Sequence, residues 1–102
     1  ALMADRADAF VALPGGFGTC DELFEILTWA QLGIHRKPVA VLNVGGFFDP
    51  LLAWVDHLTA AGFVKAAHRS LVRVAATVGE LFEVLAAPAD AAAVKWATPE
   101  ER

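Results

Sequence analysis

The stretch that decides the fold is residues 9–22, which reads Ala9-Phe10-Val11-Ala12-Leu13-Pro14-Gly15-Gly16-Phe17-Gly18-Thr19-Cys20-Asp21-Glu22. A short apolar run leads into three glycines, and an amphipathic segment follows them directly. Glycine lets backbone N–H groups approach a ligand closely, and the first turn of a helix attracts anions through its unpaired N–H groups and its dipole. The stretch therefore predicts a strand, a phosphate-binding loop and a helix that carries the carboxylate of Glu22 one turn in.

The composition limits the class of protein. With 102 residues the chain is long enough for one domain, and 57% hydrophobic residues is a high content for a soluble monomer of this size. We therefore expect a partner, or a part of the protein that is absent here, to cover some apolar surface. The net charge of −4 argues against nucleic-acid binding, and no apolar run approaches the roughly 20 residues that cross a bilayer. The single cysteine, Cys20, favours a reducing cytoplasm.

Three short apolar segments predict a parallel sheet that is covered on both faces: residues 9–13, 38–44 and 71–76. A helical pattern follows each of them, over residues 19–32, 49–61 and 77–86. Gly33 and Gly62 are the expected ends of the first two helices, and Asp49, followed by Pro50 as the first helical residue, is the expected N-cap of the second. The order βαβαβα is typical of a Rossmann-like α/β fold with helices flanking the sheet. We expect residues 1–87 to be the C-terminal part of one such domain, with further strands upstream of Ala1, and residues 88–102 to be an Ala-rich tail.

The pattern Thr19-Cys20-Asp21-Glu22 has two interpretations. It fits a capping box, in which Thr19 caps the helix and Glu22 bonds back to it, and the same pattern recurs at Thr77–Glu80. The approach from a strand through glycines, found at Thr19 but not at Thr77, favours a phosphate site with a functional carboxylate. The glycine spacing is neither G-x-G-x-x-G nor that of a P-loop, so a monophosphate fits better than a dinucleotide or a nucleoside triphosphate.

The motif Pro14-Gly15-Gly16-Phe17-Gly18-Thr19-Cys20-Asp21-Glu22 matches P-G-G-x-G-T-x-x-E and resembles the hallmark of the Lonely Guy (LOG) family. The likeness continues through residues 29–35, 37–39 and 42–44. Members of this family are cytokinin riboside 5′-monophosphate phosphoribohydrolases, formerly described as lysine decarboxylase-like. The resemblance implies a Rossmann-like homodimer without a cofactor. It would hydrolyse the N-glycosidic bond of a nucleoside 5′-monophosphate to a free base and ribose 5-phosphate.

The resemblance also implies the residues of the site. Glu22 would be catalytic, and the phosphate and ribose would be bound by Gly15, Gly16, Phe17, Gly18, Thr19 and Thr28. The Arg-Lys pair of the family lies just before the segment that Ala1-Leu2-Met3 resembles. We therefore expect the catalytic arginine upstream of this chain, and we expect the 102 residues alone to be inactive. Cys20 and Asp21 replace the Leu and Glu that are common in the family, without an obvious effect on the loop.

Two other functions stay open at this point. A broader AMP or purine nucleosidase would use the same phosphate loop and the same carboxylate of Glu22. A non-catalytic carrier of a nucleotide or of the molybdenum cofactor shares the fold and a glycine-rich loop. The base preference is left undetermined, because upstream residues help to form the base pocket.

Other residues have plainer interpretations. The first helix is apolar over more than one stripe, which predicts burial against both the sheet and a partner subunit. The three histidines share no ligand spacing, which argues against a metal site: His35, His57 and His68. We expect Gly45-Gly46 to form a turn in preference to a substrate contact, and Phe48 and Trp54 to pack in the core in preference to lining an adenine pocket. His35-Arg36-Lys37 is expected to complement the dipole at the end of the first helix.

Overall fold

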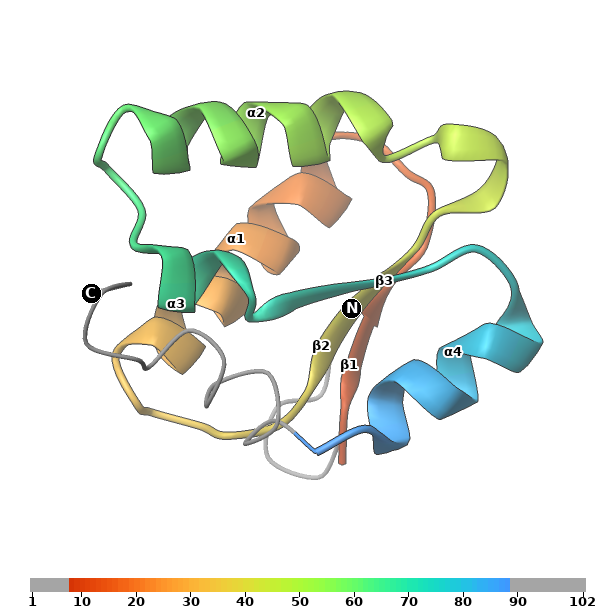
Figure 1. The fold of residues 1–102 in the computed structure, drawn as a ribbon. Helices are drawn as coiled ribbons and strands as arrows, with labels where there is room; N and C mark the ends of the chain where they lie inside the picture. The colour runs from red at the N-terminus through yellow and green to blue at the C-terminus, as the bar shows by residue number, and fades with distance from the viewer. Residues whose placement is uncertain (1–7, 89–102) are drawn as a thin grey trace.

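The computed structural model describes residues 8–88, which fold around a three-stranded parallel sheet (Figure 1). The strands lie side by side in chain order: β1 (Phe10–Ala12), β2 (Val39–Leu42) and β3 (Val72–Ala75). Each strand lies within a predicted range. Both pairings are parallel, with Ala12 opposite Val41 and Leu42 opposite Ala75. The predicted Rossmann-like α/β arrangement is confirmed.

Helices cover both faces of the sheet, with α1 (Phe17–Gln31) and α2 (Asp49–Ala60) on one face and α4 (Val78–Ala86) on the other (Figure 1). Successive side chains of a strand point to opposite faces, so β2 contributes to two clusters. Val39 and Val41 join the core beneath α1 and α2, whereas Ala40 and Leu42 pack with Leu81 of α4. All four residues of β2 are buried, as expected of a central parallel strand.

The ends of two helices and the start of a third agree with the prediction. Gly33 (φ 78°) and Gly62 (φ 89°) adopt the left-handed conformation just after α1 and α2, where a side chain would be strained. At the start of α4, Thr77 Oγ1 accepts a hydrogen bond from the Glu80 N–H at 3.1 Å. Glu80 Oε1 accepts one from the Ala76 N–H at 3.3 Å. The predicted capping pattern is therefore present, except that the Glu80 side chain bonds to the N–H of Ala76 instead of that of Thr77.

The predicted start of the first helix is wrong. α1 begins at Phe17 with Gly16 as its N-cap, and no side chain caps it. The Cys20 N–H donates to the Gly16 carbonyl at 3.3 Å, so the helical hydrogen bonds already reach back to Gly16. Thr19 therefore lies inside the first turn, where it cannot act as the N-cap. The capping-box interpretation of Thr19 and Glu22 is excluded.

The second helix also starts one residue earlier than predicted. Its N-cap is Phe48, and Asp49 is helical instead of capping the helix. Asp49 Oδ1 accepts a hydrogen bond from Asn43 Nδ2 at 2.8 Å, which directs its carboxylate away from its own helix. Between these two residues the predicted glycine turn is observed as the 3-10 turn η1 (Val44–Gly46).

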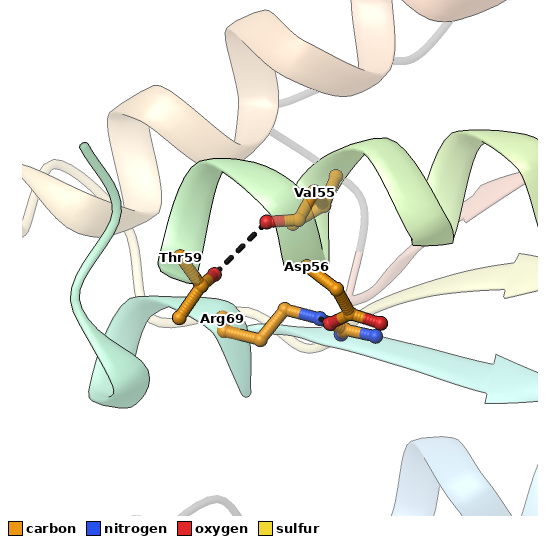
Figure 2. A network of polar contacts seen from close by, with 4 residues as sticks. All are labelled: Val55, Asp56, Thr59 and Arg69. Carbon is orange, nitrogen blue, oxygen red and sulfur yellow. Dashed lines mark hydrogen bonds and ion pairs between the residues drawn. The ribbon is translucent and has the colours of Figure 1, made fainter. Parts of the chain in front are cut away.

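The sequence reasoning missed a short helix, α3 (Ala66–Arg69), which packs beside α2. Figure 2 shows the contact, in which Arg69 Nε of α3 donates to Asp56 Oδ1 of α2 at 2.5 Å; beside it, Thr59 Oγ1 donates within α2 to the Val55 carbonyl at 2.9 Å. Asp56 is largely exposed, and an ion pair in that setting contributes at most about 1 kcal/mol to stability. The ion pair therefore orients α3 more than it stabilises the fold.

Two predictions lie outside the described residues. They are the match of Ala1-Leu2-Met3 to the family's upstream segment and the Ala-rich tail, of which only Pro88 is described. Within residues 8–88, no helix combines the length and the apolar character needed to cross a membrane.

Candidate functional site

The glycine loop leaves the carboxyl end of β1 and enters α1 directly. Residues 14–18 are all exposed, so a ligand can reach their backbone. The N-cap of α1 is Gly16, which has no side chain to occupy the first N–H groups. The N–H groups of Phe17, Gly18 and Thr19 precede the first helical hydrogen bond and can be donated to an anion. The start of α1 thus has the features expected of an anion site at the carboxyl edge of a parallel sheet.

The three glycines of the loop serve different purposes. None of them has a positive φ, so none is required by a left-handed backbone. A Cβ built on Gly15 would overlap with Thr19 Oγ1 and lie 3.2 Å from Thr19 Cβ, so Gly15 is needed for packing within the loop. A Cβ built on Gly16 or Gly18 would meet no atom within 4 Å. Packing within residues 8–88 does not explain these two glycines, whereas close approach of a ligand does.

Glu22 lies on α1 beside the core-facing side of the helix. Its neighbour Leu23 is fully buried, Ile26 one turn further along is buried as well, and Glu22 itself is half-buried. Glu22 is five positions after Phe17, which corresponds to about 7.5 Å of rise along the helix axis. The backbone of Glu22 therefore lies about one and a half turns into the helix, and its side chain leans back toward the first turn, as helical side chains do.

Thr28 lies apart from the loop. It is exposed, and its hydroxyl donates to the Phe24 carbonyl at 2.7 Å. Helical geometry separates Thr28 from Glu22 by about 9 Å along the axis and about 120° around it. The structure therefore does not bring these two residues onto one face of α1, and the role of Thr28 in substrate binding stays a prediction.

The remaining candidates have structural explanations, with one correction. Phe48 is buried in the core as predicted, but Trp54 is 54% exposed and stacks on His57 with ring centroids 5.5 Å apart. The predicted core role of Trp54 is wrong, because α2 turns that position away from the sheet. Cys20 is half-buried in the first turn of α1 and is not in a disulfide.

His35 has a different role from the one predicted. The backbone N–H of Lys37 donates to His35 Nδ1 at 3.1 Å, which leaves Nε2 as the protonated nitrogen that donates to the Ile26 carbonyl at 3.0 Å. The ring also packs edge-on against Phe10. His35 thus fixes the connection between α1 and β2 instead of complementing the helix end. Among the described residues, no group of three potential metal ligands occurs.

The sequence reasoning missed Asn43. Its side chain bridges the end of β2 and the start of α2, because Oδ1 accepts from the Phe48 N–H at 2.6 Å while Nδ2 donates to Asp49. A signal was present, since Asn43 is the first polar residue after a fully buried strand, at the edge where ligands bind in open α/β sheets.

Together, the fold and this edge define an α/β protein whose glycine loop offers backbone N–H groups to an anion, with a carboxylate on the same helix. Residues 1–85 match the model of the family described as possible lysine decarboxylase. The chain belongs to that family.

Proteins named as phosphoribohydrolases or as probable phosphoribohydrolases are among its relatives. The chain is 57% identical over 81 residues to the probable cytokinin riboside 5′-monophosphate phosphoribohydrolase LOGL1 of Oryza sativa subsp. japonica, over 79% of this chain and 36% of that protein. It is 54% identical over 81 residues to the cytokinin riboside 5′-monophosphate phosphoribohydrolase LOG of the same species, over 79% of this chain and 34% of that protein. It is 49% identical over 85 residues to the cytokinin riboside 5′-monophosphate phosphoribohydrolase LOG2 of Arabidopsis thaliana, over 83% of this chain and 40% of that protein. The resemblance to the LOG family is confirmed, and the matched segment spans between 34% and 40% of these relatives.

Proposed function

We propose that the protein hydrolyses the N-glycosidic bond of a nucleoside 5′-monophosphate, releasing a free base and ribose 5-phosphate. One observation carries the proposal: the uncapped start of α1 lies beside two glycines whose Cβ positions are open, and a half-buried carboxylate follows on the same helix. The relatives named as phosphoribohydrolases for cytokinin riboside 5′-monophosphate support the same chemistry.

The proposed mechanism separates anchoring from reaction. The N–H groups of Phe17, Gly18 and Thr19 bind the phosphate, so the binding energy of a remote group orients the reacting sugar. Breaking the ribosyl C–N bond develops positive charge on the sugar. The carboxylate of Glu22 stabilises that charge or orients the attacking water. No step calls for a cofactor.

Two alternatives make different use of the same residues. A general AMP or purine nucleosidase shares the phosphate anchor and Glu22 and differs only in the base that it accepts. A carrier of a nucleotide or of the molybdenum cofactor has no need of a carboxylate beside the sugar. Glu22 therefore favours an enzyme over a carrier.

The direct test is base release by the protein expressed from its complete reading frame. We expect isopentenyladenosine 5′-monophosphate to be hydrolysed at least tenfold faster, in kcat/KM, than its dephosphorylated nucleoside, because a charge-assisted phosphate contact is lost with the phosphate. AMP, assayed in parallel, distinguishes a cytokinin-specific enzyme from a general nucleosidase. Equal activity on nucleotide and nucleoside would contradict the phosphate anchor, and binding without base release would favour the carrier.

We also propose that the protein is a homodimer, with α1 contributing to the interface. Leu23 and Ile26 face the core, whereas Leu32 and Ile34, which directly follow the end of α1, are 66% and 65% exposed. A second copy would cover this surface.

The oligomeric state checks this proposal. Light scattering on the complete protein should give twice the mass of one chain. Ile34→Asp should shift the mass toward the monomer, because the substitution places a charge in an apolar interface. A monomeric wild-type protein at micromolar concentration would contradict the proposal.

A further inference from the structure

The segment from Asn43 to Phe48 lies at the same edge of the sheet as the glycine loop. Ala12 is opposite Val41 in parallel register, so β1 and β2 end side by side and their following loops leave at the same edge (Figure 1). The Asn43 N–H donates to the Ala75 carbonyl at 2.6 Å, so the segment starts from a strand end that is still paired with β3. Its first residue therefore has a fixed position relative to the sheet.

The far end of the segment is fixed relative to α1. Phe48 is only 2% exposed and belongs to the same core cluster as Leu23, the residue that follows Glu22. The cluster thus places the end of the segment beneath the helix that carries the carboxylate. Both ends of the segment are anchored in parts of the structure that position the proposed site.

The side chain of Asn43 closes the segment into one defined shape. Oδ1 accepts from the Phe48 N–H at 2.6 Å, and Nδ2 donates to Asp49 Oδ1 at 2.8 Å. Between them Gly45 (φ 58°) and Gly46 (φ 75°) are both left-handed, and a Cβ on Gly46 would lie 2.7 Å from Asp49 Oδ2. An alternative conformation would have to give up these contacts, so the segment is held in place by its own side chains.

This well-fixed segment nevertheless exposes apolar side chains. Val44 is 53% exposed and Phe47 is 49% exposed, and residues 44–48 contain no charged group. Phe47 packs edge-on against the buried ring of Phe48, with centroids 5.0 Å apart, which supports its orientation. A supported aromatic ring at the ligand edge of the sheet is suited to contact the flat face of a nucleobase.

We propose that the Asn43–Phe48 segment is the wall of the substrate site that contacts the base, and that Asn43 is the positioning residue that holds Phe47 and Val44 in place. The inference rests on the proposed function. The glycine loop binds the phosphate of the nucleotide, Glu22 faces the sugar, and this segment contacts the base and any apolar substituent on it.

Binding measured in a Glu22→Gln background tests the inference, because hydrolysis is then expected to be slow on the time scale of the titration. The complete protein is titrated with isopentenyladenosine 5′-monophosphate and, separately, with ribose 5-phosphate, which has no base. Phe47→Ala should weaken binding of the nucleotide about tenfold and leave the Kd of ribose 5-phosphate unchanged, because base–aromatic stacking is lost. Trp54→Ala, which removes an aromatic side chain exposed to a similar extent on α2, should change neither Kd.

The role of Asn43 is tested by a charge repulsion and its rescue. Asn43→Asp keeps an acceptor for the Phe48 N–H but places a carboxylate against Asp49. This variant should lose nucleotide affinity as Phe47→Ala does. The double variant Asn43→Asp, Asp49→Asn restores a donor opposite an acceptor and should recover most of the affinity.

The outcomes separate this inference from the function on which it rests. A parallel loss of ribose 5-phosphate binding, an unchanged nucleotide Kd in Phe47→Ala, or no rescue in the double variant would overturn the inference. None of these results depends on base release, whereas the proposed function fails if the wild-type enzyme releases no base. The two failures are therefore distinguishable.

Discussion

Replacing Glu22 by Gln in the complete protein is expected to lower kcat for base release by about 10²- to 10⁴-fold, the usual range for loss of an acid–base or charge-stabilising group. Gln keeps the size and the hydrogen-bonding atoms of the side chain but removes its negative charge. The KM for the nucleotide should change little, because in the proposed mechanism the backbone N–H groups of the loop, and not Glu22, bind the phosphate. Steady-state kinetics of base release measures both constants.

Asp21 provides the matched control for this experiment. It lies next to Glu22 on the same turn of α1 and is exposed, whereas Glu22 is half-buried beside the core-facing side. Asp21→Asn removes one negative charge from the same region and should leave kcat within about twofold of the wild type, as a screened surface charge has little effect. Near-normal turnover in Glu22→Gln, or an equal loss in Asp21→Asn, would show that the carboxylate of Glu22 has no specific role.

Gly18→Ala is expected to change the stability of the protein and its activity on the nucleotide in opposite directions. Gly18 is the second residue of α1, and a Cβ built there meets no protein atom within 4 Å. Replacing a helical glycine by alanine should raise the free energy of unfolding by about 0.5–1 kcal/mol. The same Cβ obstructs the close approach of the phosphate, so kcat/KM for the nucleotide should fall about tenfold or more through loss of a charge-assisted hydrogen bond.

The control for this variant is Gly79, the second residue of α4. A Cβ there would have Thr77 Oγ1 at 4.0 Å as its nearest neighbour, an ordinary contact. Gly79→Ala should stabilise the protein to a similar extent and leave kcat/KM unchanged. Thermal unfolding and the nucleotide assay are compared for both variants. Full activity in Gly18→Ala would mean that the phosphate does not approach this part of α1.

Much of the fold followed from local patterns. The three strands were predicted because short apolar runs that alternate with helical patterns are typical of the parallel strands of an α/β domain. The ends of α1 and α2 were predicted because Gly33 and Gly62 occupy left-handed positions that other residues tolerate poorly. The cap at Thr77 was also local, since its hydroxyl reaches the Glu80 N–H three residues away.

The errors arose at helix starts and on a helix face, where the true helix bounds and neighbouring side chains decided the outcome. Thr19 and Thr77 begin the same local pattern, but only Thr77 caps its helix, because the hydrogen bonds of α1 extend back to Gly16. Asp49 was expected to cap α2, but the side chain of Asn43 engages it instead. Trp54 is apolar, yet its position on α2 turns it away from the sheet.

The sequence by itself determined the class of this protein: the glycine motif, the strand before it and the carboxylate after it are all contained within one short stretch. Local chemistry specifies such a unit, because its turn, helix and charge depend on neighbouring residues. Only the tertiary structure decided which features at the carboxyl edge of the sheet come together. The loop after β2 lies beside the glycine loop because parallel strands end at a common edge, and Asn43 closes that loop through contacts that no local pattern predicts.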